Sequence, residues 1–522
     1  MTEETRYLIV GSGVAGGLVA EQLLARGSGS VTMLEAGPPV KMRDRRTWLD
    51  YVMAGRLPYD HLSDTASDYD VSGNQPWRIE GGRLIVRGGS TLHWGGWCPR
   101  MKPEDFHLAT NTGKGGLDWP FTYKDLDPYY LQAEHYLQVA GDSDQQNPPR
   151  SGKYLFRAPP YTLVDGEMID ALHKMKVSYE HMPVARNGRP VNDLPNCMTT
   201  GTCYYCPIGG RFTGDQPLDR LSVQKRFTLK TGAAVTQLLA DGKRITGVTY
   251  LDLETGKSHK IEADKVILCA GALETPKLML VSKSSQWPEG VGNTHDLVGR
   301  YLIANPYFYA RGAKDINRSY LQEETYFPTL CSRHWDGPED QAKGKFILNR
   351  GESPDLKPAV LMSQGKTRKE LDAMKIGPYV FEIQGALQTF SYKQNRITPG
   401  KGTTRFGLSR TQIDMPVDVL DTEHKATVHG RMSKVLETMG YRLLEGEVGL
   451  GVYPQRGDHA MSTCRMGKTP EQGVVDPDLK VFGTDNLYIL SNAVFPSGAA
   501  ANPTLTLAAL AFRFMDHLLG RK

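Results

Sequence analysis

The 522-residue sequence has almost no excess charge, because 62 basic residues face 58 acidic ones and leave +4. Without a basic tail or patch, a nucleic-acid partner is not expected. No apolar run approaches the roughly 20 residues that cross a bilayer, and the start, MTEETRYLIVGSG, lacks the features of a secretory signal peptide. The C-terminal stretch LTLAALAFRFMDHLL is interrupted by charged residues and is typical of an amphipathic helix. The length favours two or three packed domains.

Cysteine is scarce, and the seven present are an odd number that does not favour a disulfide framework. Three of them, Cys197, Cys203 and Cys206, lie in one polar stretch, NCMTTGTCYYCPIGGRF at 196–212. The pattern is C-x5-C-x2-C followed by proline, and iron–sulfur clusters are held by closely spaced cysteine thiolates, often ending in a Cys-Pro pair. A zinc half-site, a redox-active C-x-x-C pair and three inert thiols are the alternatives. The spacing alone leaves all four readings open.

The N-terminal stretch predicts a dinucleotide-binding βαβ unit. A short apolar strand at 7–10 runs into Gly11, Gly13 and Gly16, which complete G-x-G-x-x-G. The first glycine permits the tight turn, the second admits the pyrophosphate and the third lets the following helix pack on the sheet. The helix N-terminus faces the phosphates. A second strand, VTMLE, ends in Glu35, which is placed to bind the ribose hydroxyls of the adenosine.

A later stretch favours FAD over NAD. HKIEADKVILCAGALETPKLML contains an apolar strand that ends at Gly271, and we expect a helix to begin near Thr275. Such a late strand commonly returns beside the first one in flavoproteins whose nucleotide domain is assembled from distant parts of the chain.

Further motifs resemble the glucose–methanol–choline (GMC) family of FAD-dependent oxidoreductases. They are RLIVRGGSTLHWGGWCPRMKPEDF at 83–106, DWPFTYKDLDPYY close behind it, GNTHDLVGRYLIANP at 292–306 and DHAMSTCRMG at 458–467, with VFGTDNLYILSNAVFPSGAAANPTLTLAALA further on. GGSTLHW and ANPTLTLAALA look most like sugar oxidoreductases: the catalytic subunits of bacterial FAD-dependent glucose dehydrogenases and glucoside 3-dehydrogenases, and more distantly pyranose oxidase. One departure is Ser462, which stands at the glycine of the family's HPxGT pattern.

The resemblance implies an α/β fold in which a Rossmann-like FAD-binding domain accompanies a second, α+β substrate domain. We expect the FAD-binding domain to be discontinuous, at 1–120, 220–305 and 455–522. The substrate-binding domain then comprises 121–219 and 306–454, with the cysteine-rich loop at 196–212. Residues 150–230 and 307–440 match no family pattern and are expected to hold the substrate-facing elements.

The resemblance also implies the site residues. His459 matches the catalytic base, and Asn502, at the start of the last helix, matches the residue that orients the substrate hydroxyl; a histidine titrates near neutral pH and suits the proton transfer. His93 matches a histidine that is covalently bonded to the flavin in some sugar oxidases and is not bonded in other relatives. The positions expected to bind FAD are Gly11, Gly13, Gly16, Glu35, Arg87, Gly89, Ser90, His93, Gly95, Val235, Ala270, Asn492 and Thr504.

The expected function is that of an FAD-dependent sugar dehydrogenase, which oxidises a pyranose hydroxyl of glucose or a glucoside at C3 or C1. Relatives with a cysteine-rich insertion carry a [3Fe-4S] cluster, so resemblance favours Cys197, Cys203 and Cys206 as its ligands. Such relatives travel to the periplasm with a small chaperone-like subunit and pass electrons to a cytochrome, so a periplasmic complex is expected and a cytoplasmic enzyme is the alternative. The alternative function is a sugar or glycoside oxidase that forms hydrogen peroxide without a cluster.

Overall fold

The protein is described here as a computed structural model. The structure describes residues 3–74, 77–200, 202–315, 327–351, 361–362, 365–373, 379–418, 422–453 and 455–520. Position 201 in the cysteine-rich loop and the predicted domain limit at 454 lie outside these ranges, as do positions 1 and 522.

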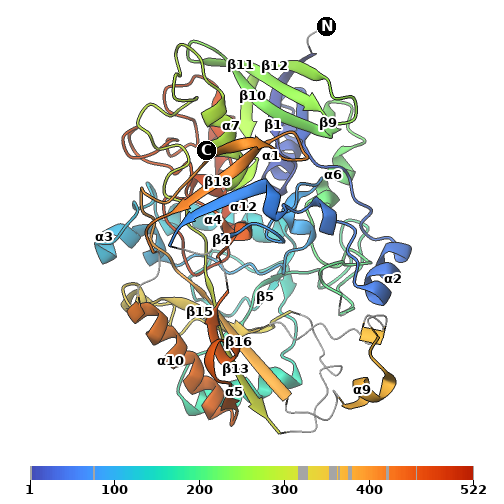
Figure 1. The fold of residues 1–522 in the computed structure, drawn as a ribbon, viewed down its shortest axis with the longest axis vertical. Helices are drawn as coiled ribbons and strands as arrows, with labels where there is room; N and C mark the ends of the chain where they lie inside the picture. The colour runs from blue at the N-terminus through green and yellow to red at the C-terminus, as the bar shows by residue number, and fades with distance from the viewer. Residues whose placement is uncertain are drawn as a thin grey trace.

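A largely parallel sheet occupies the upper half of the molecule in Figure 1. Its order is β10-β11-β12-β1-β2-β9, with β22 beside β12. The predicted late strand does return beside the first one, because β12 pairs in parallel with β1, which pairs in parallel with β2 on its other side. The strands are β1 (Glu3–Val10), β2 (Val31–Glu35), β9 (Phe227–Thr231), β10 (Ala233–Asp241), β11 (Arg244–Asp252), β12 (Ser258–Leu268) and β22 (Leu487–Ile489).

Three helices accompany this sheet in the chain order. Helix α1 (Val14–Ala25) follows β1, α7 (Gly271–Val281) follows β12, and α12 (Pro503–Leu518) is the last helix. Helix α7 begins four positions before Thr275, where the sequence predicted its start; Ala272 and Leu273 are buried against the core, so the turn preceding Pro276 is helical too. Helix α12 packs on α1 and on α4 (Tyr123–Tyr136), although α4 belongs to the stretch expected in the substrate domain. The last helix thereby joins both parts of the chain.

A second, antiparallel sheet lies in the lower half of Figure 1, flanked by α10 (Thr422–Thr438) and α5 (Leu163–Lys174). Its order is β19-β13-β16-β15-β14-β7, with β20 beside β13. The strands β7 and β13 to β16 lie in the two stretches, 150–230 and 307–440, that were expected to hold the substrate-facing elements, whereas β19 and β20 follow the second stretch. The strands are β7 (Glu180–His181), β13 (Tyr307–Lys314), β14 (Leu330–Ser332), β15 (Phe346–Arg350), β16 (Tyr379–Leu387), β19 (Arg442–Leu443) and β20 (Leu450–Val452).

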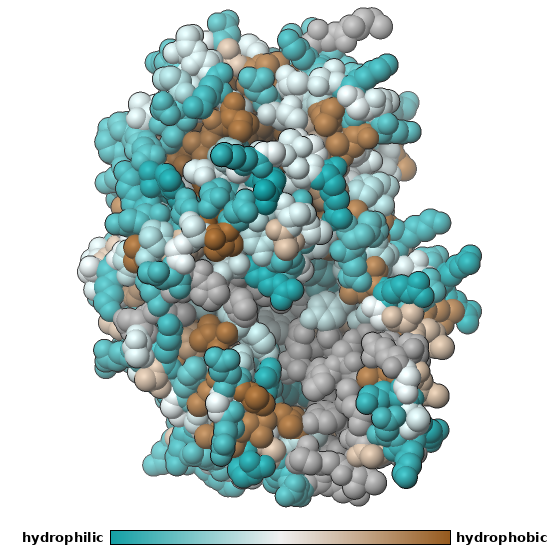
Figure 2. All heavy atoms as spheres, in the orientation of Figure 1, coloured by the Kyte–Doolittle hydropathy of each residue, from teal (hydrophilic) through white to brown (hydrophobic). Residues whose placement is uncertain are grey.

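Smaller sheets and helices connect the two halves, giving a mixed α/β protein of two main sheets. Within the described ranges, no helix is both long and apolar enough to span a membrane. The described residues on the face seen in Figure 2 are mostly hydrophilic, with separate hydrophobic clusters. The remaining elements are α2 (Arg45–Ala54), α3 (Leu108–Thr112), α6 (Asp215–Leu221), α9 (Arg368–Ala373), α11 (Gly446–Gly449), β3 (Tyr69–Gly73), β4 (Trp77–Arg78), β5 (Val139–Gly141), β6 (Phe156–Arg157), β8 (Val184–Ala185), β17 (Arg396–Thr403), β18 (Ser409–Met415) and β21 (Gln455–Arg456).

Candidate active site

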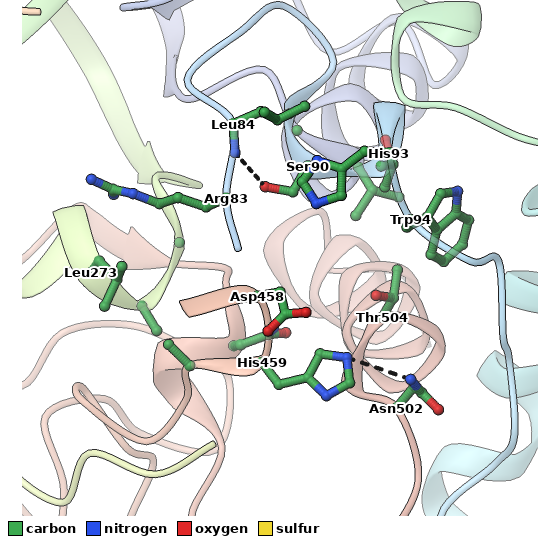
Figure 3. A pocket seen from close by; sticks show the side chains of 18 of the residues that line it. Arg83, Leu84, Ser90, His93, Trp94, Leu273, Asp458, His459, Asn502 and Thr504 are labelled. Atoms are coloured by element: carbon green, nitrogen blue, oxygen red, sulfur yellow. Dashed lines mark hydrogen bonds between the residues drawn. The ribbon is translucent and has the colours of Figure 1, made fainter. Parts of the chain in front are cut away.

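One cavity of about 870 Å³ is lined by residues of both main sheets. One side is formed by the glycine-rich turn after β1, the 83–97 segment and the turn after β12. The other is formed by β13, β16 and the segments around 458–460, 490–492 and 502–507. In Figure 3, Ser90 and His93 face His459 and Asn502 across this space. The cavity is therefore where a dinucleotide and a substrate can meet.

The glycine-rich turn has the geometry that its spacing predicts. Gly11 has φ +101°, and a Cβ there would lie 2.6 Å from the carbonyl oxygen of Cys269. A Cβ on Gly16 would lie 2.2 Å from the carbonyl oxygen of Gly11, so only glycine allows α1 to approach the turn this closely. Gly13 lines the cavity, and a Cβ there would meet no protein atom within 4 Å, so the space beside it is open to a ligand.

Glu35 lies at the end of β2 and lines the same cavity. Its carboxylate accepts hydrogen bonds from the Ser12 backbone at 2.9 Å, the Ser12 hydroxyl at 2.7 Å and the Gly37 backbone at 2.8 Å. Burial raises the pKa of Glu35, and these hydrogen bonds partly offset that effect. A carboxylate offers about four lone-pair sites, so this fixed side chain can also accept from ribose hydroxyls.

The 83–97 segment lies directly against the glycine-rich turn. Gly89 has φ +63°, and a Cβ on it would stand 3.0 Å from Cα of Gly13. The Ser90 hydroxyl accepts a hydrogen bond from the Leu84 backbone at 3.0 Å, and Ser90, His93 and Gly95 all line the cavity (Figure 3).

Two of the expected FAD-binding residues do not line the cavity. Gly16 lies behind the turn, and its effect on the cavity is indirect. Its close approach to Gly11 lets α1 pack against the turn. Arg87 pairs with Asp219 on the side of α6 at 2.8 Å, so the structure places it outside the lining. The sequence could not separate Arg87 from its neighbours, because adjacent side chains of a loop point in different directions.

The remaining expected positions, Val235, Ala270, Asn492 and Thr504, lie on four separate elements and all line the cavity. The buried Oδ1 of Asn492 has no hydrogen-bond partner among the described residues. A buried acceptor of this kind is costly unless a ligand or water satisfies it. Together with the open space at Gly13, this acceptor fits a bound FAD.

His459 and Asn502 meet at the wall opposite the 83–97 segment (Figure 3). Asn502 Nδ2 lies 3.4 Å from His459 Nε2 and 2.9 Å from the Tyr307 hydroxyl. Because an amide NH₂ only donates, Nε2 is the acceptor in this contact when the ring hydrogen is on Nδ1. Nε2 then carries the lone pair that a base needs, and Asn502 can hold an oxygen beside it.

Asn502 occupies the N-cap position of α12, where an asparagine commonly bonds the first turn. Its side chain makes no such capping bond and is turned instead toward Tyr307 and His459. Pro503 at the first helical position leaves one fewer backbone N–H to satisfy. The side chain is therefore free to serve the cavity.

Sequence reasoning missed Tyr307 and a polar group on the second sheet. Tyr307, Tyr309 and Arg311 alternate along β13 with fully or largely buried residues, so the side chains of these three share one face. Arg311 lines the cavity together with Glu382, Gln384 and Tyr453. The alternation of polar and apolar residues in YFYARG was the available signal for this face. It did not reveal which strands pair with β13.

The cysteine-rich loop packs beside the 92–95 segment. The buried Arg211 donates to the carbonyl oxygens of Trp94 and of Leu92, and Arg186 donates to that of Gly95 at 3.1 Å. Burial raises the pKa of the Cys203 thiol, and Arg186 and Arg211 partly offset this. The loop is thus linked to a cavity-lining segment through the buried guanidinium group of Arg211, and the neighbouring Arg186 binds the same segment.

Cys197, Cys203 and Cys206 are partly exposed free thiols. The described part of the chain contains no group of three or more His, Cys, Asp or Glu side chains placed to hold a metal ion. The arrangement seen here therefore does not fit an assembled cluster, although the three thiols are close enough for Cys197 and Cys206 to affect the pKa of Cys203.

Comparisons with known proteins agree with this architecture. The N-terminal part of GMC oxidoreductases matches residues 172–306, and the C-terminal part matches residues 391–511. The chain belongs to the GMC oxidoreductases, enzymes acting on CH–OH groups.

The chain is similar along its length to characterised enzymes. It is 26% identical to the fructose dehydrogenase large subunit of Gluconobacter japonicus, covering 98% of this chain and 97% of that one. It is 24% identical to the C-glycoside 3-oxidase of Microbacterium trichothecenolyticum, covering 83% and 74%. The solved formate oxidase of Aspergillus oryzae RIB40, whose structure concerns FAD modification, superposes with a TM-score of 0.69 at 15% identity over 99% and 98% of the two chains.

Family membership and the fitted cavity identify FAD as the cofactor. When bound, FAD supplies the acceptor for the hydride that leaves the carbon bearing the hydroxyl. The glycine-rich turn, Glu35 and the 83–97 segment would hold it, with His459 and Asn502 on the substrate side. The protein is accordingly a sugar or alcohol oxidoreductase.

Proposed function

We propose that this protein is an FAD-dependent sugar dehydrogenase that oxidises a hydroxyl of glucose or a glucoside. The main observation behind the proposal is the orientation of the Asn502 side chain. It makes no capping bond to α12 and instead contacts His459 and Tyr307 inside the FAD cavity. The similarity to enzymes named for fructose and for C-glycosides supports a sugar as the substrate.

In the proposed reaction His459 acts as the base. Its Nε2 accepts the hydroxyl proton, while the Asn502 amide donates to the same oxygen and holds the C–H bond toward the flavin. The proton transfer contributes typically 10²–10⁴-fold to the rate, and the amide stabilises developing alkoxide charge. Tyr307 accepts a hydrogen bond from Asn502 and so fixes the orientation of the amide.

C3 is the first candidate for the oxidised position and C1 the second. Oxidation at C3 yields a ketone and leaves the glycosidic bond intact, whereas oxidation at C1 requires a free anomeric hydroxyl and yields a lactone. The likeness to a C-glycoside 3-oxidase, whose name specifies position 3, supports the first choice. Product analysis with a methyl glucoside separates the two, since its C1 is blocked.

We further propose that Cys197, Cys203 and Cys206 would hold a [3Fe-4S] cluster if iron and sulfide drew the three thiols together, and that this cluster would carry electrons away from the flavin. In this proposal a small chaperone-like subunit and a cytochrome act as partners, and the complex is periplasmic. The name of the fructose dehydrogenase large subunit supports a multi-subunit enzyme. The contact of Arg211, within the cysteine-rich loop, with the carbonyl oxygens of Leu92 and Trp94 supports electron transfer at this point. A cytoplasmic location is the alternative.

The test is to determine iron and acid-labile sulfide per flavin on anaerobically purified protein, with an EPR spectrum of the same sample. About three irons per FAD and a three-iron signal are expected of the dehydrogenase. The rival function is a sugar or glycoside oxidase, favoured by the oxidase named among the relatives. Iron-free protein whose sugar-reduced flavin is rapidly reoxidised by air, with hydrogen peroxide as the product, would establish the oxidase.

A further inference from the structure

A polar group on the second sheet lines the cavity beyond the catalytic pair. Arg311 on β13 lies directly across from Glu382 on β16, and Gln384 on β16 lies across from Tyr309. Tyr453 follows β20, and its backbone N–H bonds the carbonyl oxygen of Tyr307 at 2.8 Å. These positions place Arg311, Glu382, Gln384 and Tyr453, here called the distal cluster, on one face of the sheet.

Glu382 organises the distal cluster. Its carboxylate accepts from Arg311 Nε at 2.6 Å, from Gln384 Nε2 at 2.6 Å and from the Tyr453 hydroxyl at 3.0 Å to each oxygen. Arg311 also donates to the Tyr453 hydroxyl at 3.0 Å, and its guanidinium lies 4.4 Å from the centre of the Tyr309 ring. Each partner is therefore held in one orientation by a side chain that is only 13% exposed.

The cluster keeps hydrogen-bonding capacity for a ligand. Gln384 uses one amide hydrogen in its contact with Glu382, and an amide has a second hydrogen and a carbonyl acceptor. Arg311 has five N–H donors on a planar group. Fixed planar donors and acceptors of this kind suit neighbouring hydroxyls.

The charge of Glu382 is already compensated within the cluster. The ion pair with Arg311 is short, and Glu382 raises the pKa of Arg311 against the opposing effect of burial. Burial and Glu382 raise the pKa of Tyr453 to about 12, so the phenol remains protonated and donates at neutral pH. A carboxylate held in this way does not serve as counter-ion for a cationic substrate, and the cluster suits an uncharged polyhydroxylated ligand.

The position of the cluster along β13 indicates which part of the substrate it meets. Tyr307 contacts the catalytic Asn502, and Arg311 is four residues further along the same strand. At about 3.4 Å per residue in an antiparallel strand, the two Cα atoms are roughly 13–14 Å apart. This span is longer than a single pyranose ring. A ring whose hydroxyl lies at His459 therefore does not reach Arg311, and the part of the cavity beside Arg311 remains available to another group.

We propose that the distal cluster binds a second sugar ring, attached to the one that is oxidised, and that Glu382 is the positioning residue of this subsite. This inference rests on the proposed function. The enzyme then prefers disaccharides and larger glycosides to free glucose, because hydrogen bonds to Arg311 and Gln384 are available only to the second ring.

The experiment measures flavin reduction by stopped flow under anaerobic conditions, with glucose, methyl β-glucoside, cellobiose and maltose. The ratio of the reduction rate constant to the apparent dissociation constant is compared for wild type, Glu382→Gln and Gln384→Ala. Gln384→Ala keeps the Arg311–Glu382 ion pair and so guards against a folding defect in Glu382→Gln. Glu437→Gln is the control, because it removes a carboxylate of a largely exposed Lys434 pair on α10.

We expect one disaccharide to exceed methyl β-glucoside by ten-fold or more, and both cluster variants to lose most of this advantage through weaker binding. Methyl β-glucoside is expected to change less than three-fold in both variants, and the control not at all. Equal ratios for one-ring and two-ring sugars, or equal losses for both in the variants, overturn the subsite while leaving the sugar dehydrogenase intact. Absence of flavin reduction by every sugar in wild type overturns the proposed function itself.

Discussion

Asn502 Nδ2 lies 3.4 Å from His459 Nε2, and the two residues are brought together from the start of α12 and the turn after β21. The amide reaches the imidazole because it makes no capping bond to its own helix. A packing role and a helix-start role were the ordinary alternatives for these residues in isolation. The observed contact, with Tyr307 as third member, favours a shared role at the reacting hydroxyl.

Replacing His459 by alanine is expected to slow flavin reduction by sugar by about 10²–10⁴-fold, since the base that accepts the proton is lost. FAD content is expected to stay near wild type, because the dinucleotide is held mainly by other segments. Anaerobic stopped-flow absorbance measures the rate. His295→Ala serves as control, because that side chain is exposed and faces Glu471 at 3.8 Å. A His459→Ala protein that reduces its flavin at the wild-type rate contradicts the assignment.

Gly11→Ala is expected to lower the stability of the fold, whereas Gly13→Ala is expected to weaken FAD binding. The first puts a methyl group 2.6 Å from a backbone oxygen at φ +101°, so folding itself should suffer by ~3 kcal/mol or more. The second meets no protein atom within 4 Å, so the apoprotein should fold normally and bind FAD at least ten-fold more weakly. Thermal unfolding of the apoproteins and FAD titration separate the two effects. Equal FAD affinity in Gly13→Ala would place the pyrophosphate elsewhere.

Ser462→Gly is expected to stabilise the protein by about 1 kcal/mol. Ser462 has φ +73° where glycine is favoured, and its buried hydroxyl has no hydrogen-bond partner among the described residues. Urea unfolding of the FAD-loaded protein measures the change. Ser462→Ala removes the hydroxyl and keeps the strained backbone, so its free energy of unfolding should rise less than that of the glycine variant. A larger rise for alanine would show that the buried hydroxyl alone, and not the backbone conformation, destabilises the wild type.

Glu180 is expected to make the stability of the protein depend on pH. Burial raises its pKa to about 7, against the opposing charges of Arg333 and Lys102. Between about pH 4.5 and 7 the native state holds this proton while the unfolded chain has released it, so stability falls as the pH rises through this window. The contribution is at most about 3 kcal/mol.

The measurement for Glu180 is the urea midpoint at pH 5 and pH 8. Relative to wild type, Glu180→Gln is expected to become more stable as the pH rises, because glutamine does not titrate. Glu423→Gln, which removes an exposed carboxylate of α10, should follow wild type. Parallel curves for wild type and Glu180→Gln would show that this carboxyl titrates normally.

Changing Cys197, Cys203 or Cys206 to serine is expected to abolish bound iron and cytochrome c reduction while leaving flavin reduction by sugar within about two-fold. Chemical iron analysis and cytochrome absorbance provide the two readings. Cys464→Ala is the control, since that cysteine is buried near Met279 and remote in sequence from the loop. Serine variants that still reduce cytochrome c at the wild-type rate would remove the loop from the electron path.

The βαβ unit and its glycine-rich turn could be predicted from the sequence because their signals are local. The glycines and Glu35 lie within one βαβ unit, where each residue type has a fixed task. The return of β12 to β1 also followed from a family pattern. Arg87 is not among the cavity-lining residues and α7 begins earlier than expected, because side-chain direction in a loop and the first turn of a helix depend on packing that no local pattern records.

The distal cluster could not be predicted at all. Arg311 and Glu382 are 71 positions apart and meet only because β13 and β16 pair in one particular register. A shift of that register by one residue would turn Glu382 to the other face of the sheet. Such contacts arise from strand pairing across the whole second sheet, and no spacing in the sequence encodes it.

The pairing of β1 with β12 determines when the cavity can form during synthesis. Tyr7 of β1 pairs with Lys265 of β12. More than half of the chain is therefore synthesised before β12 can pair with this edge of β1. β22, His459 and α12 emerge later still. Until then β1 presents an open strand edge of the kind that invites wrong pairing. The cavity is therefore complete only after the C-terminal segments that line it have been synthesised.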